Sequence, residues 1–420
     1  MTIRLRHLAA INPPVPEWEQ ISDDCLLTFI PLEAVWPRQV DFTRAKTKSE
    51  TSTGYTRLME GDVVVPKITP TFEADRSTWI RGSPTTVLTG TTELHVVRPG
   101  GKLDPRYLDY LLSSRPFLEG GASEMIGVAG QKRVPDEWLR NFLVPITDLS
   151  QQRKIADYLD IETTRIEALI SKKRRLTELL DERRAAYVGS AVVIGLDNRD
   201  DLVETGNHHV PQLPSGWRLM RLRHVVEEII DTPHKTAPVV DDKEYLVVRT
   251  ANVKTGRLVF DDARYTDRAS WIEWNRRGEP CPGDVMFTRE APAGEACVVP
   301  AGVPLCIGQR MVLFRVNPAV ACGEWIVHSI YSGPAQRFIE TLSNATTVAH
   351  LNMSDIHDIP IAVPDKDEQQ QILAQVRREV RRHEEAVSKL NEQITLLAER
   401  RQALITAVVT GEMPVPGVSA

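Results

Sequence analysis

QRKIADYLDIETTRIEALISKKRRLTELLDERRAAYVGSAVV, residues 152–193, decides how this chain is organised, because a second stretch repeats its pattern. That second stretch, residues 369–410, reads QQQILAQVRREVRRHEEAVSKLNEQITLLAERRQALITAVVT. A constant offset of 217 positions sets Gln152 on Gln369 and, without a gap, LLDERR at 179–184 on LLAERR at 396–401. A match of this length at one offset indicates an internal duplication.

Both stretches carry a stripe of apolar residues at alternating spacings of three and four, which predicts long helices over 151–190 and 367–412. The stripes are Ile155, Leu159, Ile166, Leu169, Leu176, Leu180 and Tyr187, and Ile372, Val376, Ala386, Leu390, Leu397 and Leu404. Polar residues interrupt them at Glu162, Lys173, Arg183, His383 and Gln393. A helix with one narrow stripe needs a partner. We therefore expect the duplicates to pair as an antiparallel coiled coil.

The two helices leave two globular modules, 1–150 and 213–366, with a polar linker at 191–212 and a tail at 413–420. Strand-like runs such as Met311-Val312-Leu313-Phe314 alternate with amphipathic stretches such as 107–113 and 325–332. The predicted fold class is mixed α/β, with two modules separated by the helices in a pseudo-two-fold repeat.

The modules share short motifs but differ in most of their sequence. Each has a proline–tryptophan motif near its start, Pro16-Glu17-Trp18 and Pro214-Ser215-Gly216-Trp217, which we take as the opening of the repeat unit. Each then has a glycine–aspartate pair before an apolar strand, at Gly61-Asp62 and at Gly283-Asp284. The pattern predicts a constant frame that carries two variable modules.

Composition narrows the class of protein. The chain has 420 residues, 42% hydrophobic and 26% charged, with a formal net charge of −6. It lacks a run of 18 apolar residues and an apolar signal core, so we expect a cytoplasmic protein. The five cysteines form no C-x-x-C pair, which suits a reducing compartment and predicts no metal site. A mildly acidic total disfavours indiscriminate coating of nucleic acid but permits local basic patches.

The usual catalytic motifs are missing from the sequence. There is no phosphate-binding G-x-x-x-x-G-K-[ST], no G-x-G-x-x-G and no G-x-S-x-G. Asn12-Pro13-Pro14-Val15 resembles the N-P-P-aromatic loop of amino-methyltransferases, but Val15 replaces the aromatic and only eleven residues precede it. Those residues leave no room for a cofactor-binding strand and turn, so a stand-alone methyltransferase is disfavoured.

The junctions between modules and helices carry a family resemblance. The first is GVAGQKRV at 127–134, followed by Val144-Pro145-Ile146 and Gln151-Gln152; the second is HLNMS at 350–354, followed by Ile359-Pro360-Ile361 and Glu368-Gln369. With GDVMFTR at 283–289, they resemble the specificity subunit of type I DNA restriction-modification systems. Thr147 and Gln151 depart from the family pattern.

The resemblance implies a DNA-binding subunit with no catalysis of its own. Each module would read one half of a split double-stranded target in the major groove, and the helices would fix the spacing. Two methyltransferase subunits, which bind S-adenosylmethionine, would dock along the helices, and motor-nuclease subunits using ATP and Mg would join them. No cofactor is expected on this chain itself.

Base reading needs arginine, lysine, asparagine or glutamine side chains on loops that face the groove. The candidates are Lys67, Arg76, Arg81, Gln131, Lys132 and Arg133 in the first module, and Arg289, Gln309, Arg310, Asn344, His350 and Asn352 in the second. Arg276 and Arg277 are candidates for phosphate contacts. For each residue the alternative is a solvated surface charge.

The motif repeated in both helices is a candidate docking surface for the methyltransferase subunits. It comprises Glu182, Arg183 and Arg184, and Glu399, Arg400 and Arg401. The alternative is ordinary pairing of exposed charges along a helix. For the whole chain the alternative function is a coiled-coil scaffold or adaptor that does not recognise DNA.

Overall fold

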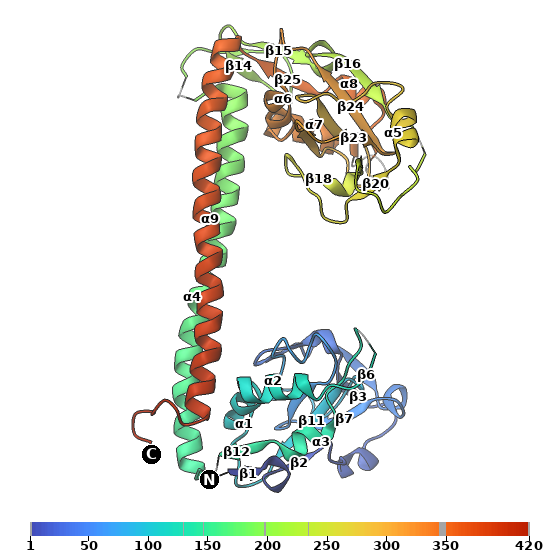
Figure 1. Cartoon of the computed structure of the whole chain (residues 1–420). Helices are drawn as coiled ribbons and strands as arrows, with labels where there is room; N and C mark the ends of the chain where they lie inside the picture. The colour runs from blue at the N-terminus through green and yellow to red at the C-terminus, as the bar shows by residue number, and fades with distance from the viewer. Residues whose placement is uncertain are drawn as a thin grey trace. The chain divides into compact units, whose positions relative to one another are not determined.

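The computed structural model describes residues 2–128, 130–145, 147–196, 199–233, 235–343 and 350–418. These form two compact units (Figure 1). Unit 1 comprises Met1–Arg174 with Leu390–Ala420, and unit 2 comprises Arg175–Lys389. The first module lies in unit 1 and the second in unit 2. Each unit also takes one half of each long helix, α4 (Leu149–Ile194) and α9 (Lys366–Val409).

The first module holds two four-stranded sheets. One has the order β2-β11-β8-β9 and is antiparallel throughout: Ala9–Ile11, Leu94–Pro99, Val63–Pro66 and Thr78–Trp79. The other has the order β6-β3-β10-β7, with β3 and β10 parallel: Ala45–Thr47, Leu26–Ile30, Val87–Gly90 and Thr56–Met59. Short strands β4 (Val35–Trp36) and β5 (Gln39–Val40) form a hairpin.

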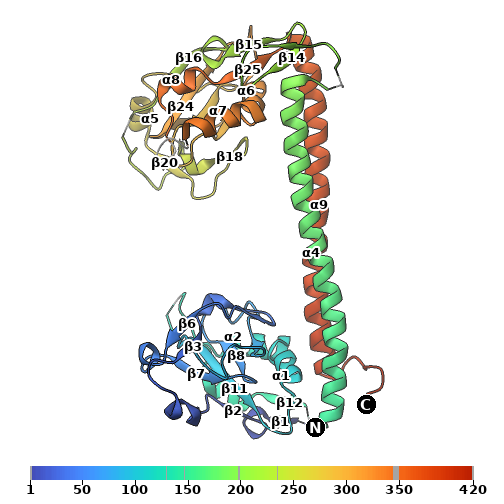
Figure 2. The same cartoon turned by 180° about the vertical axis from the view of Figure 1, so that it is seen from behind.

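Three short helices and a terminal strand pair complete the first module. The helices are α1 (Pro105–Leu112), α2 (Arg115–Ser123) and α3 (Asp136–Asn141). β1 (Thr2–Arg4) pairs with β12 (Leu143–Pro145) immediately before α4. Helix α1 lies beside the long helices in both views (Figure 2).

The second module repeats this plan. The sheet β16-β24-β21-β22 comprises Val226–Asp231, Met311–Val316, Val285–Thr288 and Ala296–Val298. The sheet β20-β17-β23 comprises Arg264–Thr266, Tyr245–Val248 and Leu305–Ile307, with β17 and β23 parallel. A hairpin of β18 (Val253–Lys254) and β19 (Arg257–Leu258) corresponds to β4 and β5, while β7 has no counterpart among the described strands.

The remaining elements of the second module match in the same way. β15 (Arg218–Arg221) pairs with β25 (Pro360–Val363) just before α9, as β1 pairs with β12 before α4. Helices α6 (Gly323–Ile330), α7 (Gly333–Ser343) and α8 (Met353–His357) follow the order of α1, α2 and α3. Helix α5 (Arg268–Trp274) belongs to the second module alone among the described residues.

In each unit the long helices pair antiparallel. In unit 1, Ile155 and Leu159 of α4 share a core with Ile405 and Val408 of α9. In unit 2, the core joins residues 188–192 of α4 to residues 372–376 of α9. Polar interruptions of the stripes meet across the pair, since Lys173 Nζ lies 2.6 Å from Gln393 Oε1. The antiparallel coiled coil is confirmed. Helix α4, 46 residues long, extends beyond its expected range at both ends, whereas α9, 44 residues long, starts one residue earlier and ends three residues earlier than expected.

The repeat opens at a different motif from the one that we predicted. Leu5-Arg6-His7 and Leu222-Arg223-His224 form matching 3₁₀ turns at the offset of 217. The buried Leu5 donates its amide to Phe142 O at 2.8 Å, and Leu222 donates to Ile359 O at 2.9 Å. Trp18 instead follows β2 and packs with Leu27 and Val87, whereas Trp217 precedes β15 and packs on Trp325. The two P-x-W motifs are therefore not equivalent.

The segment expected as a linker is largely structured. Helix α4 runs to Ile194, and β13 (Leu202–Glu204) pairs with β14 (Gln212–Pro214). Arg199 donates to Glu368 at 2.6 Å, and Trp217 Nε1 donates to the same carboxylate at 2.9 Å. These bonds tie the segment to the start of α9.

Candidate nucleic-acid interface

The glycine–aspartate pairs position the strand that leads to the candidate site in each module. Gly61 and Gly283 both have φ of 96°, a backbone conformation that favours glycine. Asp62 accepts the Met59 amide at 2.8 Å and pairs with Arg98 at 2.7 Å. The equivalent Asp284 accepts the Cys281 amide at 2.9 Å and pairs with Arg315 at 3.3 Å. Both aspartates are buried, so their role is to fix the start of β8 and β21.

Candidate residues of both modules gather where these strands end. After β8, Ile68 bridges to Arg133; after β21, Glu290 bridges to His350. Arg133 and His350 are 217 positions apart, so they occupy equivalent places in the two modules. We call these two places the strand-end corners.

The corner of the first module contains several basic side chains and one acidic side chain, that of Glu93. The guanidinium of Arg133 makes a two-pronged contact with Glu93, whose shortest distance is 2.7 Å, and this contact raises the pKa of Arg133. Lys67 donates to Thr92 O at 2.9 Å, and partial burial lowers the pKa of its ammonium. Gln131 and Lys132 are exposed, and the Lys132 side chain makes no hydrogen bond or ion pair with the described residues. Lys132 is therefore the cation freest to reach a ligand.

The corner of the second module is built differently. Arg289 is buried, with Nη1 at 3.1 Å from both carboxylate oxygens of Asp231. Glu290 lies between Arg310 and His350, at 3.6 Å from Arg310 Nε and 3.3 Å from His350 Nδ1. Arg310 is exposed and has φ of 70°. The structure thus brings Arg310 and His350 together at the surface and places Arg289 beneath them.

The other candidates lie apart from these corners. Arg76 stacks on Trp36 at 4.0 Å, and Arg81 lies 5.4 Å from the ring of Trp79. Arg276 is exposed, and Arg277 donates to Asp231 O at 3.0 Å. Asn352 caps α8, and Gln309 is half-buried. Asn344 lies outside the described residues.

A cluster of cations and aromatic rings in the first module was missed from the sequence. Lys46 lies over Phe29 and Tyr55 at 4.6 and 4.8 Å, and Arg57 lies 4.3 Å from the ring of Trp18. Both cations are on strands of the second sheet, β6 and β7. Lys46, Tyr55 and Arg57 lie within twelve residues of one another in the sequence, but Phe29 and Trp18 come from earlier segments, so no local pattern indicated the cluster.

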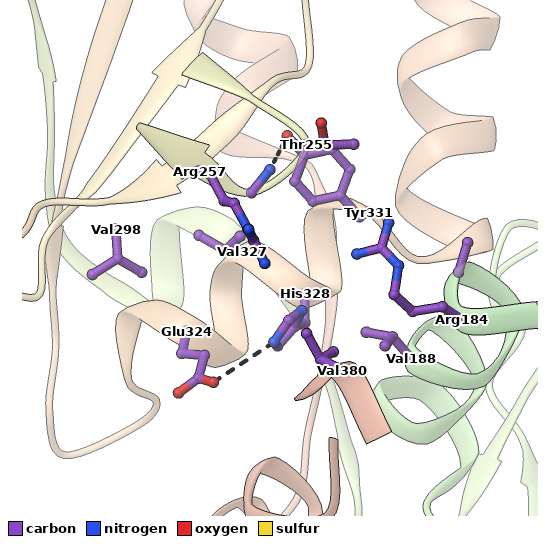
Figure 3. A pocket seen from close by; sticks show the side chains of 12 residues that line it. Arg184, Val188, Thr255, Arg257, Val298, Glu324, Val327, His328, Tyr331 and Val380 are labelled. Carbon is purple, nitrogen blue, oxygen red and sulfur yellow. Dashed lines mark hydrogen bonds and ion pairs between the residues drawn. The ribbon is translucent and has the colours of Figure 1, made fainter. Parts of the chain in front are cut away.

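The repeated helix motif splits into outward and inward residues. Glu182, Arg183, Glu399 and Arg400 are exposed, whereas Arg184 and Arg401 are half-buried. Arg401 pairs with Glu167 at 3.1 Å inside unit 1. Arg184 lines a cavity of about 280 Å³ in unit 2, together with Val188, Tyr331 and Val380 (Figure 3). Within the two motifs, the glutamate and the first arginine are therefore the side chains most exposed to a docking partner.

The asparagine of the N-P-P motif has a structural role. Asn12 has φ of 50°, its Oδ1 accepts the Val96 amide at 2.9 Å, and its Nδ2 lies 3.2 Å from His95 Nδ1. Both ends of the amide are therefore occupied within the sheet.

The described residues offer neither a metal site nor a membrane-spanning helix. No group of three or more His, Cys, Asp or Glu side chains is arranged to hold a metal ion. None of the described helices is apolar over enough of its length to cross a membrane.

Comparison with known proteins finds a similarity in the second half of the chain. The family model described as the type I restriction modification DNA specificity domain matches residues 215–396. The match covers less than half of the chain, namely the second module and part of α9.

Individual relatives are similar to part of the chain. The EcoAI specificity subunit of Escherichia coli is 30% identical over 269 residues, and the EcoEI specificity subunit of the same species is 28% identical over 269 residues. These alignments cover 61% and 62% of this chain but 40% of each relative, so the chain spans less than half of their length.

Solved structures show the same fold at low identity. A chain from a study of complex assembly in the type I R-M system aligns over 98% of both chains with a TM-score of 0.69 and 17% identity. The HsdS subunit from Thermoanaerobacter tengcongensis aligns over 98% of this chain and 97% of its own, with a TM-score of 0.51 and 16% identity.

Proposed function

We propose that this chain is the DNA-specificity subunit of a type I restriction-modification complex. Each module would read one half of a split double-stranded target. The observation that carries the proposal is the pair of strand-end corners, where exposed polar and cationic side chains gather at equivalent places of two otherwise different modules. Two unlike readers on a repeated frame suit a target of two unlike halves.

Within each corner we assign base reading to the exposed residues. Gln131 and Lys132 in the first module and Arg310 in the second have side chains of the types that make hydrogen bonds to base edges. Arg133 and His350, each beside a glutamate, would orient these residues or contact phosphate. The net charge of −6 leaves much of the phosphate neutralisation to partner subunits.

The paired helices are the proposed docking site for two methyltransferase subunits. Glu182 and Arg183 on α4 and Glu399 and Arg400 on α9 are exposed at equivalent positions, which suits two identical partners. We expect the double charge reversal Arg183→Glu, Arg400→Glu to prevent co-purification with the methyltransferase while leaving thermal unfolding of the chain unchanged. Co-purification of the variant at wild-type level would exclude these arginines from the contact.

Catalysis is assigned to the partners in this proposal. S-adenosylmethionine would bind the methyltransferase subunits, and ATP and Mg the motor-nuclease subunits, in the cytoplasm. The purified chain should bind none of the three in calorimetry. Saturable binding of S-adenosylmethionine to the chain alone would instead support a methyltransferase.

The decisive experiment is a map of modified bases after co-expression with the neighbouring methyltransferase subunit. Two short, unlike sequence motifs around a fixed gap are the expected result. A methyltransferase that works with another specificity subunit but not with this chain would favour a scaffold without DNA recognition.

A further inference from the structure

One ion pair joins the first module to its own helix. Arg106, in the first turn of α1, donates to Asp157 at 2.6 Å and to Asp160 at 3.0 Å, both in α4. The Tyr110 hydroxyl donates to the other oxygen of Asp160 at 2.7 Å. The cation is on the module and the anions are on the long helix.

The second module makes the equivalent contact with opposite charges. Glu324, in the first turn of α6, accepts Arg377 Nε of α9 at 2.9 Å. His328 lies one turn further along α6, 3.8 Å from the same carboxylate (Figure 3). Burial would raise the pKa of Glu324, but hydrogen bonds from His328 and Arg377 lower it to about 2. Here the anion is on the module and the cation is on the long helix.

The two pairs occupy matching places in the repeat. Asp160 and Arg377 are 217 positions apart, the offset of the long helices, and Arg106 and Glu324 hold the same position in the matching helices α1 and α6. The charges are not exchanged everywhere along the contact between module and helix. In a second pair, the acid is on the long helix and the arginine is on the module in both halves. Glu167 of α4 lies 4.0 Å from Arg38, and Glu384 of α9, 217 positions later, is paired with Arg257.

We propose that the inverted ion pair assigns each recognition module to its own long helix. A first module placed on α9 would set Arg106 against Arg377. A second module placed on α4 would set Glu324 against Asp157 and Asp160. In either exchanged arrangement, like charges would face each other at hydrogen-bonding distance. Their repulsion disfavours packing of a module on the other module's helix. This inference concerns assembly of the chain and does not rest on the proposed function.

The position of the pair predicts where modules can be exchanged. Asp157 and Asp160 lie within the first twelve residues of α4, which starts at Leu149, and Arg377 lies twelve residues into α9, which starts at Lys366. If the junction of an exchanged module lies before Asp157 and Asp160, or before Arg377, the module is separated from the oppositely charged residue of its own helix. A module exchanged together with the first turns of its helix carries that charge with it.

The first test inverts the pair in the complete chain. Glu324→Arg and Arg377→Asp should each lower the midpoint of thermal unfolding, by about 2–4 °C for a surface-proximal pair in a unit of this size. The double variant recreates the polarity of the first half and should recover most of the loss. Arg378→Asp, one residue away and bonded to Gln375, is the matched control and should not rescue Glu324→Arg. Equal midpoints for Glu324→Arg with and without Arg377→Asp would overturn the proposal.

The second test exchanges modules. Residues 222–365 are replaced by a copy of residues 5–148, which sets a second Arg106 against Arg377. The same chimera with Ala374→Asp and Arg377→Asp restores the acids of the first half. We expect the matched chimera to unfold about 2–4 °C higher, with the gap narrowing in high salt. Equal unfolding midpoints for the two chimeras would overturn the proposal. If neither chimera folds, the point variants of the first test determine whether the proposal holds.

Discussion

His95 is held uncharged by its surroundings in the first module. It is buried in β11, with Nε2 at 2.9 Å from Val134 O and Nδ1 at 3.2 Å from the Asn12 amide. Burial lowers the pKa of His95 to about 4, the main cause, and the Val134 carbonyl only partly offsets it. This residue joins the sheet to the strand-end corner, because Val134 follows Arg133.

A pH dependence of stability follows from that shift. The folded pKa lies below the unfolded value of about 6.5, so the folded state binds fewer protons between these values. Stability from His95 is complete above pH 6.5 and falls by about 3 kcal/mol as the pH drops to 4. The variant His95→Gln should lack this component. Denaturant titrations of both proteins between pH 4 and 7 measure the difference, in which contributions from other groups cancel; parallel curves would contradict the prediction.

Two adjacent glutamines give a matched pair for a second prediction. Gln369 is 3% exposed, and its Nε2 donates to Val320 O at 2.8 Å and to Pro364 O at 3.1 Å. Gln369→Leu leaves these carbonyls without a partner and should lower the free energy of unfolding by about 2 kcal/mol. Gln370→Leu, on the exposed side of the same turn, should change it by less than about 0.5 kcal/mol. Equal losses in chemical denaturation would show that helix propensity, not the hydrogen bonds, explains the effect.

At this scale the sequence predicts residue types better than residue environments. Lys132 and Arg310 were chosen as cations on loops, and both are exposed. Arg289 was chosen for the same reason, but Asp231, 58 positions away in the sequence, pairs with it below the surface. Such a partner is set by strand pairing between β16 and β24, which no local pattern reveals.

The long helices are the elements whose period was clearest in the sequence. Ile155, Leu159 and Ile166 are buried, as the stripe predicts, but Leu169 and Leu176 of the same stripe are 48% and 46% exposed. Leu179, which the stripe leaves out, is 45% exposed. The stripe could be predicted because it is local; the depth at which each position is buried depends on the module packed against it.

Leu159 and Leu179 test this contrast within α4. Leu159→Ala removes a fully buried side chain from the core of unit 1 and should cost about 2–5 kcal/mol of unfolding free energy. Leu179→Ala should change it by less than about 0.5 kcal/mol, since alanine also favours the helix. Thermal or denaturant unfolding of the two variants compares them directly. A large loss at Leu179 would contradict the packing described for α4.

The opening of the repeat was the element that the sequence misassigned. The proline–tryptophan motifs at Trp18 and Trp217 are easy to recognise in the sequence, which led to the prediction that they occupy equivalent places at the start of the two modules. Leu5-Arg6-His7 and Leu222-Arg223-His224 share the 217 offset but are only three residues long. Measured from these turns, Leu5 to Gly61 spans 56 positions and Leu222 to Gly283 spans 61, so the modules are closer in length than the tryptophans suggest.

For the whole molecule, the proposed function predicts that base-reading variants act on one half of the target at a time. Lys132→Ala should relax or change the half-target read by the first module and leave the other half and the gap unaltered. Arg310→Ala should do the reverse. Mapping modified bases in cells that express each variant with the methyltransferase distinguishes the halves. Loss of specificity in both halves from either single variant would contradict independent reading.

The duplication, the two modules and the coiled coil could be predicted from one sequence. The two copies of the helical stretch, found at one offset, mark both the paired helices and the modules between them. The target bases could not, because exposed loop residues such as Gln131 and Lys132 carry no periodic signal.

The buried Asp62–Arg98 and Asp284–Arg315 pairs, with Gln152 and Gln369, also have a practical meaning for protein engineering. They fix the strands and the starts of the long helices through buried contacts, whereas the side chains of Gln131, Lys132 and Arg310 are exposed. A combinatorial library that keeps these contacts and randomises positions such as 131, 132 and 310 would therefore present new base-contacting side chains on an unchanged scaffold.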